Sequence, residues 1–132
     1  MKKLFFALLF LLAACNGNQN YQPAENALDA GREFIDACLK GDFSRAAFYM
    51  INNEENQKYL HKLEAEYRTK GRDGREQYRE ASITIREISD ITETETIINY
   101  HNSFDQVAHK VKVIKQNDRW LVDLSYTFNP NL

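Results

Sequence analysis

The sequence predicts an α+β fold, with N-terminal helices packed on a four-stranded antiparallel sheet. Up to residue 80, apolar and small residues recur at intervals of three and four, which is typical of helices that bury one face. From residue 81 onward, β-branched and aromatic residues dominate four segments separated by short polar turns, as in consecutive strands. Helices followed by an antiparallel meander of strands indicate the α+β class. The length of 132 residues, with 43% hydrophobic and 27% charged residues, fits one such domain.

The first fifteen residues have the layout of an export signal. Lys2 and Lys3 precede an unbroken apolar run over residues 4–14, which ends in small residues before Cys15. As a helix this run rises about 16 Å, well short of the roughly 30 Å of a membrane core. We therefore expect residues 1–14 to be a signal peptide that is removed.

The four residues Leu12-Ala13-Ala14-Cys15 resemble a bacterial lipobox. The resemblance implies that the Cys15 thiol receives a diacylglycerol, so that the chain is held on a membrane by acyl chains such as palmitate. Asn16 follows the cysteine, and by similarity to enterobacterial lipoproteins this favours the periplasmic face of the outer membrane over the inner membrane. The alternative is an ordinary secretory signal whose cleavage site happens to include a cysteine.

Residues 15–23 are read as the lipidated cysteine and a flexible polar tether, and residues 24–132 as a single domain. Loss of Lys2 and Lys3 with the signal takes the formal net charge from −2 to −4, which argues against a nucleic-acid partner. Once Cys15 carries lipid, Cys38 is the one thiol left and cannot form an internal disulfide. Because Cys38 shares a helical stripe with Phe34, we expect a buried hydrophobic residue rather than a nucleophile.

Three helices and a final turn are expected before the sheet. A helix over 24–40 ends at Gly41, and a short second helix starts at Asp42 or Ser44. Asn52 and Glu55 resemble a capping box that opens a third helix, which residues 71–74 break. Residues 75–80 add one more turn.

The strands are expected at 81–89, 92–101, 106–116 and 119–128. Ile83 and Ile85 differ in parity from Ile88, which predicts a bulge or bend in the first strand. A four-residue turn at 102–105 and a two-residue turn at 117–118 put apolar residues on one common face. The expected cross-strand pairs are Val113 with Val122, Val111 with Leu124, His109 with Tyr126, Ile98 with His109, and Tyr100 with Val107.

Two stretches carry a resemblance to a known superfamily. Leu39-Lys40-Gly41-Asp42-Phe43 with Ala46-Ala47 after the long helix, and the strand pair 111–115 and 119–123, resemble the nuclear-transport-factor-2-like superfamily, in particular its small bacterial lipoproteins of unknown function. The resemblance implies a curved sheet wrapped on the long helix as a cone. The superfamily includes ketosteroid-isomerase-like enzymes, polyketide cyclases, transport factors and non-catalytic subunits, so the fold does not select a function.

The candidate pocket comprises His109, Tyr126, Tyr100 and Ile98, which the expected register places together on the apolar face. A buried His beside Tyr could act as an acid or base. No carboxylate is expected on this face, because Glu95 and Asp123 should point outward. His61 and Glu64 would supply two metal ligands at most, so no metal site is predicted, and no cofactor-binding motif occurs.

Three hypotheses about function follow. The leading one is a non-catalytic accessory or binding domain, lipid-anchored and facing the periplasm, that engages a small apolar ligand or an envelope protein. The alternative is an isomerase- or dehydratase-like enzyme that uses His109. The third is a structural envelope domain whose cone is filled by its own side chains. A solvent-connected pocket at His109 would favour the first two. The sequence does not predict an oligomeric state.

Overall fold

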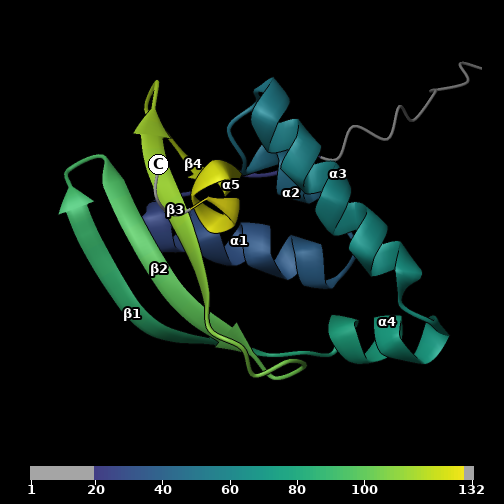
Figure 1. Ribbon diagram of the computed structural model, residues 1–132. Coiled ribbons are helices and arrows are strands. Elements are labelled where there is room, and N and C mark those ends of the chain that lie inside the picture. The colour runs from purple at the N-terminus through teal and green to yellow at the C-terminus, as the bar shows by residue number, and fades with distance from the viewer. Residues whose placement is uncertain (1–19, 130–132) are drawn as a thin grey trace, which may run out of the picture.

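The computed structural model describes residues 20–129 of the chain, and it confirms the α+β class (Figure 1). The four strands form one antiparallel sheet in the order β1-β2-β3-β4. In chain order the elements are α1 (Ala27–Leu39), α2 (Phe43–Phe48), α3 (Glu54–Thr69), α4 (Arg72–Arg79), β1 (Ile83–Thr92), β2 (Glu95–Asn102), β3 (His109–Gln116), β4 (Arg119–Asp123) and α5 (Leu124–Phe128).

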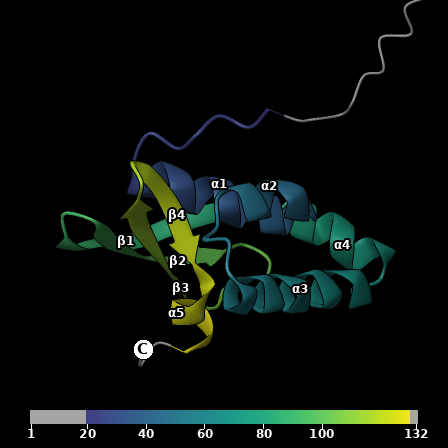
Figure 2. The ribbon, with the colours of Figure 1, turned by 90° about the horizontal axis from the view of Figure 1, so that it is seen from above.

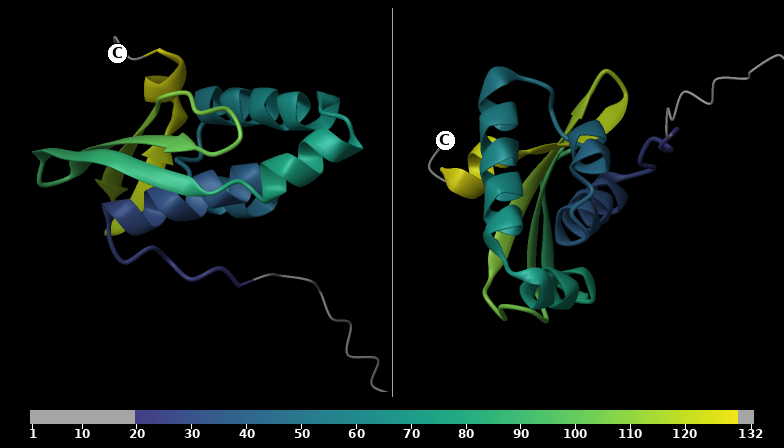
Figure 3. Two further views of the ribbon diagram at one scale, coloured as in Figure 1. Left: turned by 90° about the horizontal axis from the view of Figure 1, so that it is seen from below. Right: turned by 90° about the vertical axis from the view of Figure 1, so that its right-hand side faces the viewer.

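The long helix α1 packs on one face of the sheet. Its apolar stripe, which includes Phe34 and Ile35, is buried against Ile98, Val111 and Val113. Figure 2 and the left panel of Figure 3 show α1 with α2 along one side and α3 along the opposite side, with the sheet at one end and α4 at the other. The helices and the sheet thus surround a common interior.

The helix ends follow local capping chemistry. The Asn26 side chain accepts a hydrogen bond from the Asp29 backbone N–H at 2.8 Å and opens α1. Gly41, with φ of +71°, terminates the helical segment as expected. The third helix is capped by Asn53 rather than Asn52, and the last helical segment is two turns long and contains Gly74.

Two features of the expected sheet are confirmed. Val113 pairs with Val122 across β3 and β4. The register between β1 and β2 shifts between Ile85 and Glu87, which is the bulge that the change of parity predicts.

The expected register between β2 and β3 is wrong by two residues. Ile98 pairs with Val111 and Tyr100 pairs with His109, instead of Ile98 with His109 and Tyr100 with Val107. The loop covers residues 103–108, not four residues. Because the slip is an even number, each side chain keeps its expected face.

A side chain explains the longer loop. Asn102 Oδ1 accepts hydrogen bonds from the backbone N–H groups of Phe104 and Asp105, both at 3.0 Å. Because of this turn, β3 does not start directly after residue 105, as a four-residue hairpin would require. Gln106 then takes a positive φ of 59°.

The fourth strand ends at Asp123, whereas the sequence predicts a strand as far as residue 128. The buried side chain of Asn56 on α3 accepts a hydrogen bond from the Leu124 N–H at 2.6 Å, and Asp123 caps the helix that follows. The two pairings expected across this segment therefore do not form: Val111 with Leu124, and His109 with Tyr126.

The two edges of the sheet differ. The outer edge of β4 is covered by the segment after α2, because Ile51 N–H donates to Val122 O at 2.9 Å and Val122 N–H donates to Tyr49 O at 2.7 Å. Within residues 20–129, β1 pairs with β2 alone.

The chain before α1 packs on α2. The Tyr21 and Phe48 rings lie 5.4 Å apart, and the Tyr49 hydroxyl donates to the Gln22 carbonyl at 2.6 Å. Tyr21 and Gln22, which the sequence places in the tether, are thus part of the packed structure. The expected signal peptide and the lipidated Cys15 lie outside the described residues. No helix within residues 20–129 is long and apolar enough to span a bilayer.

Candidate functional site

A cavity of about 210 Å³ lies in the interior that the helices and the sheet surround. Of the four expected pocket residues, Tyr100 and His109 line it, while Ile98 and Tyr126 do not. The full lining is Phe34, Ile35, Cys38, Leu39, Leu63, Glu66, Lys70, Tyr78, Tyr100, Asn102, Phe104, Asp105, His109, Val111, Leu124 and Thr127. Most of these side chains are apolar or aromatic.

His109 forms the centre of the polar part of the cavity. As the first residue of β3 it pairs with Tyr100 of β2, and the two rings stack with centroids 5.4 Å apart. Its Nε2 lies 2.8 Å from Asp105 Oδ2, and the two side chains are 32% and 31% exposed. The pair is therefore at the mouth of the cavity rather than in the core.

Asp105 corrects the expectation that no carboxylate shares this face. It comes from the 103–108 loop, and its Oδ1 accepts the Val107 N–H at 2.9 Å. Partial burial raises the pKa of Asp105, but the hydrogen bonds from Val107 and His109 outweigh it and lower the pKa below its ordinary value. The carboxylate is therefore ionised at neutral pH. Its one sequence signal is the Asn102-x-x-Asp105 spacing, typical of a side-chain-stabilised turn.

The other two predicted pocket residues lie elsewhere. Ile98 is fully buried in the core beneath α1, where Gly31 approaches it. Tyr126 is in α5, and its ring lies 5.9 Å from the Lys112 ammonium. Lys112 alternates with the buried Val111 and Val113, so Tyr126 is on the opposite face of the sheet from His109.

Two aromatic residues that were not expected from the sequence, Tyr78 and Phe104, also line the cavity. The Tyr78 ring from α4 meets the Phe104 ring edge to face at 5.2 Å. The Lys70 ammonium lies 4.7 Å from the Tyr78 centroid and 6.0 Å from that of Phe104. Phe104 is 39% exposed. No sequence pattern connects α4 with this loop, because their contact depends on the fold.

Three further side chains of the cavity, Cys38, Tyr78 and Tyr100, are neutral near pH 7. Burial raises the pKa of the Cys38 thiol and of the Tyr78 hydroxyl, each to about 12. Burial likewise raises the pKa of Tyr100. Cys38 is therefore a poor nucleophile, in line with its expected structural role. Within residues 20–129, no group of three or more His, Cys, Asp and Glu side chains could hold a metal.

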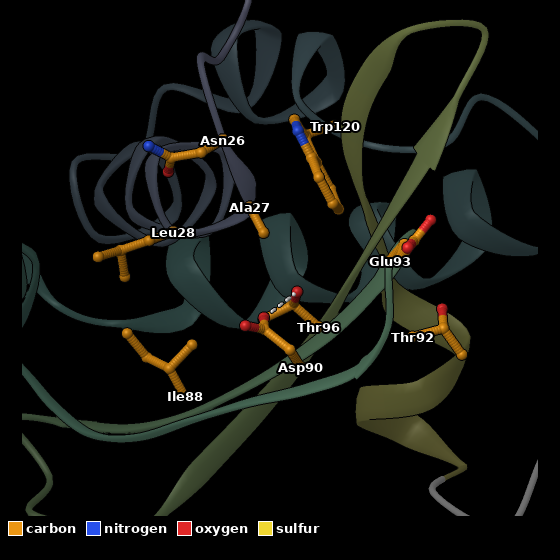
Figure 4. A pocket seen from close by; sticks show the side chains of 9 residues that line it. All are labelled: Asn26, Ala27, Leu28, Ile88, Asp90, Thr92, Glu93, Thr96 and Trp120. Carbon is orange, nitrogen blue, oxygen red and sulfur yellow. Dashed lines mark hydrogen bonds between the residues drawn. The ribbon is translucent and has the colours of Figure 1, made fainter.

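A second hollow, of about 540 Å³, lies between the start of α1 and the β1–β2 hairpin (Figure 4). Leu28, Ile88 and Trp120 supply its apolar walls, and Asp90 accepts a hydrogen bond from the Thr96 hydroxyl at 2.8 Å. This hollow is wider and more open to solvent than the cavity at His109. It contains no acid–base pair.

Comparison with known proteins agrees with the architecture. No family model matches the chain. No curated protein matches it significantly. Among solved structures, it resembles an NTF-2-like protein of unknown function from Shewanella oneidensis MR-1, with a TM-score of 0.54 and 16% sequence identity over 72% of this chain and 89% of that one. The chain therefore has the nuclear-transport-factor-2-like fold that its sequence resembles.

Proposed function

We propose that this protein is a lipid-anchored, periplasm-facing binding domain without catalytic activity, and that its cavity holds a small, largely apolar molecule. The observation that carries the proposal is the interior cavity, whose lining is mostly apolar or aromatic and includes the Asp105–His109 pair at its mouth. A few convergent polar groups in an otherwise apolar hollow are typical of sites for small ligands.

The cavity sets the size and chemistry of the ligand. Its 210 Å³ is below the roughly 300–1,000 Å³ of pockets for drug-sized molecules, so the ligand is small. The Asp105 carboxylate accepts hydrogen bonds, and His109 has a second ring nitrogen directed away from that contact. A hydroxyl group, which both donates and accepts, suits this pair. Small aromatic or aliphatic alcohols are therefore the probes of choice.

The cavity favours ligand binding over a purely structural role. A cone filled by its own side chains was expected to hold Phe34, Tyr100, Trp120 and Tyr126; Phe34 and Tyr100 line the cavity, whereas Trp120 and Tyr126 do not. The cavity that remains beside Tyr100 and His109 supports the proposal that another molecule binds there.

A matched pair of tryptophan variants tests the binding site. Leu63 on α3 lines the cavity, whereas Ala65 on the same helix is exposed. Phenol and 1-octanol should raise the melting temperature of the wild type and of Ala65→Trp, but not of Leu63→Trp, in which the added ring fills the space. An equal rise in Leu63→Trp would refute binding in this cavity.

The anchor is tested at Cys15. The lipobox-like sequence Leu12-Ala13-Ala14-Cys15 supports lipidation, and serine cannot form the thioether. Cells grown with labelled palmitate should yield labelled wild-type protein in the membrane fraction and unlabelled, released Cys15→Ser. A labelled, membrane-bound Cys15→Ser variant would contradict the proposal.

The Asp105–His109 contact supports one second candidate, an enzyme of the isomerase or dehydratase type. A carboxylate that orients an imidazole is a recurrent arrangement in acid–base catalysis. His109→Gln distinguishes the two: in an enzyme it abolishes conversion of a bound alcohol while the thermal shift persists, and in a binding protein it weakens the shift and no conversion is seen in either form.

A further inference from the structure

Within the described residues, β1 is an edge strand of the sheet whose outer side no other strand covers. β1 has ten residues, and in Figure 1 it forms the outer border of the sheet. Its exposed side chains include Ile88 at 46% and Ile91 at 55%. The opposite edge, at β4, is covered by the segment that contains Tyr49 and Ile51. An uncovered edge presents unpaired backbone N–H and C=O groups that another strand can join.

The bulge in β1 makes this strand complementary to itself. Ile83 and Ile85 pair with Asn102 and Tyr100 of β2, and after the bulge Ile88 and Asp90 pair with Ile98 and Thr96. These β2 partners alternate along one strand, so the four β1 residues share the face that α1 covers. The change of parity falls at Arg86, near the middle of the strand.

A two-fold axis between Arg86 and Glu87 then gives a consistent antiparallel register. It places Ile85 opposite Ile88 of a second copy and Ile83 opposite its Asp90, so every pair shares a face. In a regular strand, a two-fold axis between two residues would place side chains from opposite faces of the sheet opposite each other. The extra residue in the bulge shifts one half of the strand by one position, so that paired side chains lie on the same face. If the axis passed through a residue instead, each half of the bulged strand would pair with the other half so that opposing side chains point to opposite faces of the sheet.

The charges at this axis are complementary. Arg86 of each copy lies opposite Glu87 of the other, which gives two attractive cross-strand pairs. Within the described residues, neither Arg86 nor Glu87 takes part in an ion pair, and the Glu87 carboxylate accepts a hydrogen bond from Ser89 alone. The other charged group of the paired segment, Asp90, is held by Thr96.

We propose that two copies of this chain associate through antiparallel pairing of β1 with β1, centred between Arg86 and Glu87, to form a continuous eight-stranded sheet. Such an interface is isologous, as in most homodimers. The two-fold axis is perpendicular to the sheet, so α1 and the chain segment before it lie on the same side in both copies. The right-hand panel of Figure 3 shows that segment on the α1 side. In the proposed dimer, the segments that precede α1 in the two copies therefore lie on the same side of the shared sheet.

Charge reversal tests this register. The full chain is followed by sedimentation velocity in a density-matched detergent over a range of concentrations. Arg86→Glu and Glu87→Arg each turn two attractive pairs into two repulsive ones, and each should raise the dimer dissociation constant at least tenfold. The double variant Arg86→Glu/Glu87→Arg restores both pairs and should return within threefold of the wild type. Arg72→Glu on exposed α4 is the control and should leave the constant unchanged.

Each other outcome overturns the proposal. A wild type that stays monomeric at all concentrations means that the edge receives another protein's strand or none. A double variant as weak as the single ones means that Arg86 and Glu87 do not meet across an axis. Far-ultraviolet circular dichroism of the double variant confirms that the fold is kept, so a failure to dimerise cannot be assigned to unfolding.

Discussion

Replacing Gly31 by Ala should destabilise the wild-type protein but stabilise a protein in which Ile98 is already Val. Gly31 lies on the buried face of α1, and a Cβ there would be 2.5 Å from Ile98 Cδ1. The next contacts, with Val113 Cγ2 at 3.7 Å and Ile98 Cγ1 at 3.9 Å, are ordinary. One methyl group of Ile98 therefore opposes the substitution.

Two opposing effects set the magnitude. Alanine in a helix is favoured over glycine by about 1 kcal/mol. Adding a methyl group to a well-packed core costs about 1–3 kcal/mol, and Ile98 is fully buried. Gly31→Ala should thus lower the free energy of unfolding by up to about 2 kcal/mol in the wild type. Ile98→Val alone should cost about 0.5–1.5 kcal/mol. With Cδ1 absent, the helix preference alone remains, and Gly31→Ala should then stabilise by about 1 kcal/mol.

Urea unfolding of the wild type, both single variants and the double variant measures this cycle. The expected result is a change in the sign of the Gly31→Ala effect between the two backgrounds. The same sign in both, or additivity within error, would falsify the claim that Cδ1 of Ile98 is the obstacle.

Three further predictions concern polar side chains that are buried or partly buried. Asn56→Ala should lower the free energy of unfolding by about 1–3 kcal/mol, because the buried Leu124 N–H loses its acceptor; a urea midpoint equal to that of the wild type would contradict this role. The Cys38 thiol should react slowly with a disulfide reagent at mildly alkaline pH until urea is added, since burial raises its pKa to about 12; fast reaction in the folded state would show that the thiol is ionised. Burial raises the pKa of Asp36, but hydrogen bonds from two basic side chains outweigh burial and lower the pKa below the ordinary 3.8. The contribution of Asp36 to stability is therefore present above pH 3.8 and is lost as the pH falls through the folded-state pKa. Asp36→Asn should therefore destabilise at neutral pH, and the difference from the wild type should disappear as the pH falls through the folded-state pKa of Asp36, as measured by urea unfolding at a series of pH values.

The fold class and the order of the elements could be predicted because they depend on local patterns. The α1 stripe that contains Phe34 and Cys38 repeats with the helical period, and β1 shows its bulge as a change in parity at Ile88. The register of β3 with β4 followed from a turn of two residues.

The errors occur where a single polar side chain, rather than a repeating pattern, decides the path of the backbone. Asn56 accepts the Leu124 N–H from 68 residues away and helps α5 to start where a strand was expected. Asn102 lengthens the next loop, which moves His109 opposite Tyr100 and brings Asp105 to it. Two of the four residues expected in the pocket, Tyr100 and His109, therefore line the cavity, and the carboxylate beside them was not expected because a loop, rather than a strand, supplies it.

If Cys15 carries the proposed lipid, the docking of Tyr21 on Phe48 limits how far the domain can move from the membrane. Four residues separate Cys15 from the described chain at Asn20, and the five Cα–Cα steps from Cys15 to Asn20 span at most about 18 Å. A domain on so short a lipid-linked tether would stay in a thin layer beside the bilayer instead of diffusing through the whole compartment. Confinement of this kind raises the effective concentration of every copy toward its neighbours. Contacts too weak to persist in dilute solution, edge pairing through β1 among them, gain occupancy at the membrane.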